Sequence, residues 1–311
     1  MRIPVIIDCD PGWDDTIAII MALSNNKLDI KAITCVAGNI SVEKTTENAK
    51  KILKLMNSNV MLASGAEKPL EYKLKTIENI HGEDGMYGLL DNVKYNVDKR
   101  KAHELIKDIL METSEKITIV ATGALTNIAL LIKKYPSAIN KIDKICMMGG
   151  GIAIGNITPY AEFNFHTDPH AAKIVFNTGI PIVMCGLNAS YKSVCKKKDI
   201  IEIEKLNNKK SELVSKILRE AGKVKRSYVP KGVLEEGDAP LYDPVPVAYL
   251  IEPNLFKTQK YNIEIETEGE KRGQTKIIDN DMYNAEVVMD ADREGVIKLL
   301  VKCLKYNNAE S

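Results

Sequence analysis

The stretch IIDCDPGWDD, residues 6–15, places four aspartates within eight positions, directly after a short apolar run. The run Ile3–Ile7 predicts a buried strand, which Pro11 and Gly12 end. A helical pattern begins at Trp13. The stretch therefore reads as a strand, a turn and a helix, with carboxylates crowded at the turn.

The crowded carboxylates belong to Asp8, Asp10, Asp14 and Asp15. If all of them are ionised they repel one another, and a hard cation with oxygen ligands, Ca²⁺ or Mg²⁺, is the simplest compensation. Aspartate is also a favoured helix N-cap, so Asp14 or Asp15 alone could serve only to start the helix. Capping has no use for all four, and the stretch predicts a metal or catalytic cluster.

The composition limits the class of protein. The chain has 311 residues, and its 43 Lys and Arg nearly balance 42 Asp and Glu, so no basic surface suggests a nucleic acid partner. The apolar runs are too short to cross a bilayer, and the N-terminus lacks the pattern of a secretory signal. Six cysteines without CxxC pairing suit a reducing compartment, so we expect a cytoplasmic protein with no membrane partner.

Apolar strands alternate with amphipathic helices along the chain. The expected strands are Ile3–Ile7, Ile30–Val36, Val60–Ala63, Ile117–Ala121, Ile142–Met148, Ile182–Cys185 and Glu286–Met289. The expected helices are Val42–Met56, Ala102–Leu110, the charged region Lys196–Arg226, and others that start near Asn127, Pro169, Pro244 and Arg293. A hairpin is expected from Tyr261–Glu266 and Thr275–Ile278. This order predicts one α/β domain, residues 1–311, with an open, mostly parallel sheet, helices on both faces and a small antiparallel extension.

Polar residues occupy the carboxyl ends of the predicted strands. Asp8 and Asp10 follow the first strand, Asn39 the second and Thr122 a later one, and a long loop follows Met148. In a parallel sheet these ends meet at one edge, where ligands bind. We therefore expect these positions to converge on one site.

A series of motifs resembles the inosine–uridine-preferring nucleoside hydrolase family. The motifs are DCDPGWDD at 8–15, VAGN at 36–39, HGEDG at 81–85, ATGALTNIA at 121–129, MMGG at 147–150, GNITPYAEFNFHTDP at 155–169 and YDPVPVAY at 242–249. The resemblance implies a Rossmann-like fold, a tightly held Ca²⁺, and hydrolysis of the N-glycosidic bond of a ribonucleoside to ribose and free base. It also implies a homodimer or homotetramer.

The resemblance assigns roles at the metal. Asp10 would be the general base, taking a proton from a Ca²⁺-bound water, and also a metal ligand. Asp15 would chelate Ca²⁺ through both oxygens, with Asp243 and the backbone carbonyl of Thr122 completing the protein ligands. Asp8 would support the loop from behind the metal.

The resemblance also assigns the sugar contacts. Asp14 and Asn164 would hold ribose hydroxyls, and Asn156 and Glu162 would hold the other side of the sugar. Asn39 would orient the water or a hydroxyl. Met148 is assigned either packing or contact with the sugar.

The departing base is where this sequence differs from the family. Many members carry a His before the second metal aspartate, and here that position is Tyr242; tyrosine, with an unperturbed pKa of ~10, is a weaker acid at neutral pH. His81 is the next candidate for contact with the leaving base. Base recognition is expected from residues 226–237, Tyr228 foremost, and GLNASYK at 186–192 also departs from the pattern. Another N-riboside, such as nicotinamide riboside, is therefore an alternative substrate.

Two further classes of function stay open at this point. Asp8 and Asp10 after an apolar strand also resemble the DxD of aspartyl phosphatases of the haloacid dehalogenase type, with Asp8 as nucleophile and Mg²⁺ as ion. A Ca²⁺-dependent nucleoside-binding protein without turnover is the non-enzymatic alternative. For single residues, Asp243 before Pro244 could be only a helix cap, and Trp13 is interpreted as core.

Overall fold

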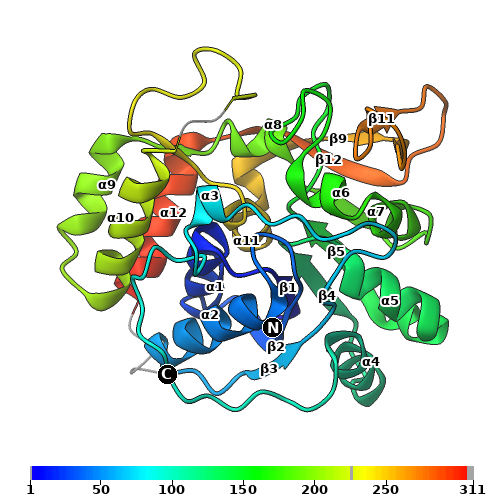
Figure 1. Cartoon of the computed structure of the whole chain (residues 1–311), viewed down its shortest axis with the longest axis horizontal. Coiled ribbons are helices and arrows are strands. Elements are labelled where there is room, and N and C mark those ends of the chain that lie inside the picture. The colour runs from blue at the N-terminus through cyan, green and yellow to red at the C-terminus, as the bar shows by residue number, and fades with distance from the viewer. Residues whose placement is uncertain (1, 225–226, 307–311) are drawn as a thin grey trace.

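An eight-stranded sheet forms the centre of the molecule in the computed structural model, which describes residues 2–224 and 227–306 (Figure 1). From one edge to the other its strands are β3 (Met61–Ser64), β2 (Leu28–Cys35), β1 (Ile3–Cys9), β4 (Ile117–Ala121), β5 (Ile142–Met147), β6 (Ile182–Met184), β12 (Ala285–Ala291) and β9 (Phe256–Tyr261). All pairs are parallel except β12 with β9. The predicted mostly parallel sheet is confirmed.

Helices cover both faces of this sheet (Figure 1). One face carries α1 (Trp13–Leu23), α2 (Val42–Leu55), α9 (Lys197–Glu204), α10 (Lys209–Ala221), α11 (Pro244–Ile251) and α12 (Arg293–Lys305). The other carries α4 (Ala102–Glu112), α5 (Thr126–Lys134) and α7 (Pro169–Phe176). The side chains of β1 alternate between the two cores, Val5 and Ile7 in one and Ile6 in the other, because successive strand residues point to opposite faces.

The strand order reverses beside β1. Chain order runs outward to β2 and β3 on one side and to β4, β5 and β6 on the other, which creates a crevice at the carboxyl ends of β1 and β4. Backbone bonds continue past the strand ends, since Thr122 N–H donates to the Asp8 carbonyl at 2.8 Å and Met148 N–H to the Ala121 carbonyl at 2.8 Å. Residues from both sides of the reversal are therefore fixed next to one another.

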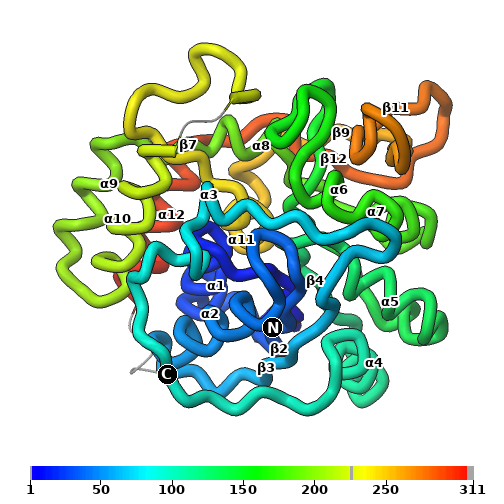
Figure 2. Tube along the Cα trace, in the orientation of Figure 1, coloured from blue at the N-terminus to red at the C-terminus, as the bar shows by residue number. Residues whose placement is uncertain are grey.

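Several connections complete the fold. The shorter elements are α3 (Glu78–His81), α6 (Phe163–Thr167), α8 (Leu187–Ser190), the 3₁₀ turns Pro136–Lys141 and Pro253–Leu255, and the strand pairs β7 (Val194–Cys195) with β8 (Ala239–Pro240) and β10 (Ile263–Ile265) with β11 (Thr275–Ile277). Figure 2 follows the long connection after β3 across the molecule to α4, with α3 as its one helical turn. All six cysteines are free and buried.

Three boundaries differ from the prediction. The region Lys196–Arg226 is two helices, α9 and α10, because Asn207 takes a left-handed conformation (φ 50°) and Asn208 caps a new helix; Arg226 lies outside the described residues. The predicted hairpin exists as β10–β11, but it is a separate two-stranded sheet. Tyr261 belongs to β9, an antiparallel edge strand that the exposed, polar sequence FKTQKY did not reveal.

The single-domain interpretation stays a prediction. Among the described residues, no helix has both the length and the apolar character that a membrane crossing requires.

Candidate active site

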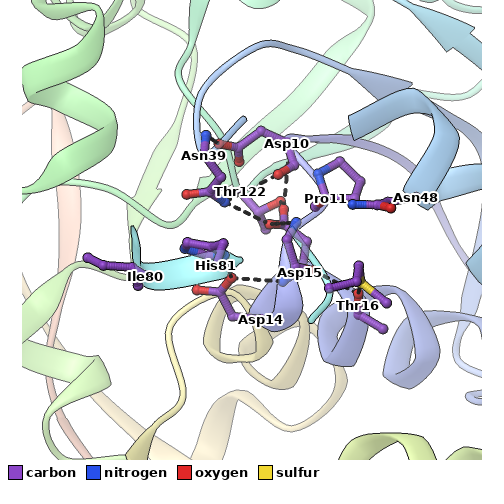
Figure 3. Close-up of polar contacts among 12 residues, drawn as sticks. Asp10, Pro11, Asp14, Asp15, Thr16, Asn39, Asn48, Ile80, His81 and Thr122 are labelled. Atoms are coloured by element: carbon purple, nitrogen blue, oxygen red, sulfur yellow. Dashed lines mark hydrogen bonds and ion pairs between the residues drawn. The ribbon is translucent and has the colours of Figure 1, made fainter. Parts of the chain in front are cut away.

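The start of α1 places Asp15 at the centre of the site (Figure 3). Gly12 is the N-cap, and Asp15 three residues later accepts the Gly12 N–H at 3.1 Å through Oδ2. The other oxygen, Oδ1, accepts the hydroxyl of Thr122 at 2.8 Å. Asp15 therefore does help to cap the helix, as one of the four aspartates was expected to, but it also joins α1 to the end of β4.

Three carboxylates form a buried cluster. Single oxygens of Asp14, Asp15 and Asp243 lie within 4.8 Å of one another. Asp243 occupies the N-cap position of α11, yet its side chain makes no capping hydrogen bond there. Capping therefore does not explain the Asp243 carboxylate, which faces the other acids instead. The cluster shares Asp15 and Asp243 with the predicted metal ligands, and it contains Asp14 where the prediction had Asp10.

Asp10 lies beside this cluster and is held by the loop after β2 (Figure 3). Its Oδ2 accepts the Asn39 N–H at 2.7 Å, and the Asn39 side-chain amide donates to the Asp10 carbonyl at 3.2 Å. A Cβ atom on Gly38 would come within 2.1 Å of Oδ2, so this close approach requires glycine. Oδ1 is buried and has no hydrogen-bond partner among the described residues. One oxygen of Asp10 is thus fixed and the other is available.

Burial and mutual repulsion make ionisation of these acids unfavourable unless a cation lies beside them. Burial, and next the Asp15 charge, raise the pKa of Asp14 to about 7 and the pKa of Asp10 well above its usual range. Burial raises the pKa of Asp15, and burial followed by the Asp14 charge raises the pKa of Asp243. A cation beside the acids would reverse these shifts. Since every donor is an oxygen, the set fits a hard divalent ion.

Asp8 faces away from the cavity. Its Oδ1 accepts the Thr34 hydroxyl at 2.5 Å and the side-chain amide of Asn127 at 2.8 Å, and burial raises its pKa to about 7. The carboxylate therefore ties β1 to β2 and to α5. Because its bonded partners lie on β2 and α5 and it is not part of the acid cluster, Asp8 is poorly placed as a phosphatase nucleophile.

The loop after β5 forms the wall beside the carboxylates. Glu162 caps the short helix α6, with Oε1 accepting the Asn164 N–H at 2.8 Å and Oε2 accepting Gly150 N–H at 2.9 Å. Burial raises the pKa of Glu162 to about 7. Asn156 helps to shape the same loop by accepting the Phe163 N–H at 2.8 Å. Both residues predicted to bind the sugar thus also stabilise the loop that carries them.

Asn164 joins this wall to the sheet. Its side-chain amide donates to the Thr122 carbonyl at 2.7 Å and to the Met148 carbonyl at 3.1 Å. The Thr122 carbonyl, predicted as a metal ligand, keeps a second lone pair because each carbonyl oxygen has two. The hydroxyl of Thr122, for which no role was predicted, donates to Asp15 instead.

A cavity of about 600 Å³ opens above the acids. Every predicted site residue lines it except Asp10 and Asp15, which are buried beneath its floor. Its lining also includes Ser227, which falls in the segment expected to recognise the base, and residues for which no site role was predicted: Trp13, Ile77, Asn79, Ile80, Tyr87, Ile157, Phe163, Glu220, Lys223 and Val224. The adjacency of Ile77–Ile80 to His81, and of Trp13 to the aspartates, is the signal that could have found some of them.

Aromatic rings form part of the cavity lining. His81, on α3, is buried rather than on the surface and stacks on Trp13 with ring centroids 5.6 Å apart. Tyr242 meets Trp13 edge-on at 6.4 Å and Tyr191 edge-on at 6.3 Å. Tyr228 lies at the mouth, with 43% of its surface exposed. The two candidates for contact with the leaving base therefore both contact Trp13.

The family of the chain follows from its sequence. The family model described as inosine-uridine preferring nucleoside hydrolase matches residues 5–298. The chain belongs to this family. It is an enzyme, a nucleoside hydrolase, and the resemblance predicted from the motifs is confirmed.

Relatives of this nucleoside hydrolase match it along its whole length. The pyrimidine-specific ribonucleoside hydrolase RihA of Escherichia coli O7:K1 (strain IAI39 / ExPEC) is 39% identical over 313 residues, covering 98% of this chain and 99% of its own. A plant nucleoside hydrolase, the PpNRh1 enzyme, has a TM-score of 0.88 at 27% identity and covers 98% of this chain and 99% of its own. A purine-preferring ribonucleoside hydrolase from Gardnerella vaginalis has a TM-score of 0.88 at 26% identity, with 97% and 98% coverage.

Proposed function

We propose that this nucleoside hydrolase cleaves the N-glycosidic bond of ribonucleosides with the aid of Ca²⁺, and that pyrimidine ribonucleosides are its preferred substrates. The observation that carries the proposal is the buried group of oxygen donors at the floor of the cavity, with the one available oxygen of Asp10 beside it. The preference for pyrimidines rests on the 39% identity to a pyrimidine-specific relative.

The cation would be held by Asp15, Asp243 and the Thr122 carbonyl, with Asp10 at its edge. When bound, a divalent cation neutralises the crowded carboxylates and lowers the pKa of a water ligand. Ca²⁺ suits the set because it accepts several carboxylate and carbonyl oxygens in a flexible shell. Asp14 would either join this shell or hold a ribose hydroxyl, as its place in the acid cluster allows.

Asp10 is the proposed general base. Cleavage of the ribosyl C–N bond develops oxocarbenium character at the anomeric carbon, and water attacks that carbon as the base departs. The proton of the water passes to Oδ1 of Asp10, while the Asn39 N–H fixes Oδ2 at 2.7 Å. The side-chain amide of Asn39 also donates to Asp15 Oδ2 at 3.4 Å, so Asn39 contacts both carboxylates and fixes their relative position.

The sugar would lie along the wall built by α6 and the loop before it. Asn164 and Asp14 would hold hydroxyls near the acids, and Asn156, Glu162 and Met148 would hold the far side. Because backbone N–H groups already fix the Glu162 carboxylate, its position does not depend on the sugar. Such prior ordering lowers the entropic cost of binding in the reactive geometry.

The departing base would lie among the aromatic rings, with Tyr228 at the mouth. Tyr242 and His81 are the proposed donors of a hydrogen bond or a proton to the leaving nitrogen. Nearby, Asn79 and Lys223 offer polar groups for the edge of a base.

A substrate panel tests the proposal. The metal-loaded enzyme is incubated with uridine, cytidine, inosine, adenosine, nicotinamide riboside and, for the phosphatase alternative, p-nitrophenyl phosphate, and products are separated by chromatography. Release of ribose and free pyrimidine, without phosphate release, is the expected result. Binding without release of any base would support the nucleoside-binding alternative and contradict the enzyme activity proposed here.

We also propose, from the family resemblance, that the protein is a cytoplasmic homodimer or homotetramer. Light scattering of the purified protein and fractionation of the source cells would test these two points. A monomer in solution, or recovery outside the cytoplasm, would contradict them.

A further inference from the structure

We propose that Trp13 is a positioning residue, which holds the His81 imidazole at the leaving-base end of the cavity. The inference rests on the proposed function, in which His81 contacts the departing base. It gives a task to a residue that the sequence indicated only as core. Trp13 is the single tryptophan of the chain.

Trp13 contacts both candidate donors. Its ring is 1% exposed, yet it lines the cavity as the first residue of α1. The His81 ring lies over the indole with centroids 5.6 Å apart and planes 27° apart. The Tyr242 ring meets it edge-on, at 6.4 Å and 62°. Paired aromatic rings at these separations stabilise one another beyond their burial, so the indole favours one placement of each neighbour.

His81 needs such a partner because its own element is short. The helix α3 has four residues, Glu78–His81, and lies within the long connection between β3 and α4. A helix of one turn is not stable by itself and takes its geometry from what it packs against. Tertiary contacts must therefore fix the imidazole.

Three of those contacts come from the start of α1. Besides the Trp13 stack, a Cβ atom on Gly12 would come within 2.3 Å of His81 Nδ1, so the ring lies directly against the N-cap glycine. Asp14 Oδ1 is 4.0 Å from the same nitrogen. The segment Gly12–Asp14 thus carries both the acids of the site and the surface that orients His81.

The indole acts through its face rather than its N–H group. Trp13 Nε1 is buried and has no hydrogen-bond partner among the described residues. A phenyl ring at this position would keep a flat apolar surface under His81 and lose no hydrogen bond. The geometry therefore predicts that Trp13→Phe is tolerated and that Trp13→Leu is not.

A double-mutant cycle tests the inference. The variants Trp13→Leu, His81→Ala and the combination are compared with wild type on uridine, which has a poor leaving group, and on p-nitrophenyl riboside, which needs no acid. We expect Trp13→Leu to lower kcat for uridine by about 10-fold, a part of the ~10²–10⁴-fold that acid–base catalysis supplies, and to change KM little. In the His81→Ala background the same substitution should cost less than about 2-fold, because residues that act as a unit are not additive.

Three readouts separate positioning from a merely structural role. Trp13→Phe should recover most of the uridine rate. Phe256→Leu, a buried aromatic substitution on the distant strand β9, should lower the melting temperature without changing the uridine-to-p-nitrophenyl riboside ratio. The emission of the single tryptophan should change in intensity or maximum in His81→Ala, since indole emission depends on the groups stacked on it.

Each contrary result overturns the inference. Equal losses on both substrates, or full additivity with His81→Ala, would mean that Trp13 does not act through His81. Unchanged emission in His81→Ala would mean that the stack does not exist in solution. If His81→Ala itself slows both substrates equally, the His81 assignment falls and the Trp13 inference with it. A wild-type enzyme that cleaves no riboside would instead contradict the proposed function, and the emission measurement would still decide whether the stack exists.

Discussion

The cavity residues proposed to bind the sugar, called the sugar end, and those proposed to bind the base, called the base end, are held in different ways. At the sugar end, the carboxylates lie at the ends of strands and at the first turn of α1, are almost fully buried, and accept hydrogen bonds from the backbone and from Thr122. At the base end, His81 comes from a one-turn helix in a long connection, and the partly exposed Tyr228 lies in the connection between α10 and β8. One end is fixed by the sheet and the other by loops.

This difference matches what each end has to recognise. The ribose and the attacking water are common to all ribonucleosides, and the ladder bond from Thr122 to Asp8 holds their site on two neighbouring strands. The base varies between substrates, and loops on a rigid scaffold can change without disturbing the sheet. We therefore expect changes at the sugar end to abolish the reaction and changes at the base end to alter its selectivity.

Removal of the metal should have the largest effect and would sharpen the comparison most. Dialysis against a chelator should lower the rate of hydrolysis on every substrate by more than about 10⁴-fold, since both water activation and charge stabilisation are lost. It should also lower the free energy of unfolding, by about 2.7 kcal/mol relative to protein in Ca²⁺ at 100 times its dissociation constant. Calorimetry and a rate assay measure both effects, and re-addition of Ca²⁺ should restore them. Full activity after verified removal of metal would contradict the proposal.

Loss of the base should come next. Asp10→Ala should lower kcat by about 10³-fold on all substrates, because general base catalysis contributes ~10²–10⁴-fold, while the fold is retained. Circular dichroism and the melting temperature check the fold. Asp199→Ala is the matched control: Asp199 is also a buried aspartate, but it pairs with Arg293 away from the cavity. If the control loses as much activity as Asp10→Ala, the loss reflects folding rather than chemistry.

A smaller and selective effect is expected at the base end. Tyr242→Phe removes only the hydroxyl and keeps the edge-on ring contact with Trp13. If the hydroxyl assists departure, kcat for uridine should fall by about 10- to 100-fold and that for p-nitrophenyl riboside should stay unchanged. Steady-state kinetics on both substrates measure the ratio. A uniform loss would break the comparison, because Tyr242 would then behave like a residue of the sugar end.

The sugar end was also the part that the sequence could predict. Apolar runs predict strands and parallel strands place their carboxyl ends together, so Asp10, Asn39 and Thr122, which follow those ends, were expected near one another and are. Asp243, which lies beside Asp14 and Asp15, was expected there only through the family resemblance. The exact pairing was not predictable. Whether Asp10 or Asp14 joins the closest carboxylates depends on side-chain rotamers at the turn, which no periodicity encodes.

The base end was predictable only in part, for the same physical reason. His81 was found through a motif, but its stacking on Trp13 was not predicted, because hydropathy alone indicates Trp13 as core. Strand β9 was not predicted, because an exposed edge strand contains few apolar residues from which a strand can be predicted. The break between α9 and α10 depends on one left-handed residue, Asn207, inside a region of continuous helical pattern.

The smallest expected effect concerns the back of the sugar-end wall, where His166 lies on α6 two residues after Asn164. Burial, and next the charges of Arg272 and Lys75, lower the pKa of His166 to about 4. The unfolded chain therefore binds a proton that the folded protein does not, so this site costs stability as the pH falls below about 6.5. His166→Gln removes this cost. When the pH is lowered from 7.5 to 5, the free energy of unfolding of wild type should therefore fall by roughly 2 kcal/mol more than that of the variant. Urea unfolding at both values measures it, and Arg272→Gln, which removes one of the charges, should shrink the shift. A pH-independent difference would mean that this wall tolerates a charged imidazole, and the sugar end would then be less rigid than its contacts indicate.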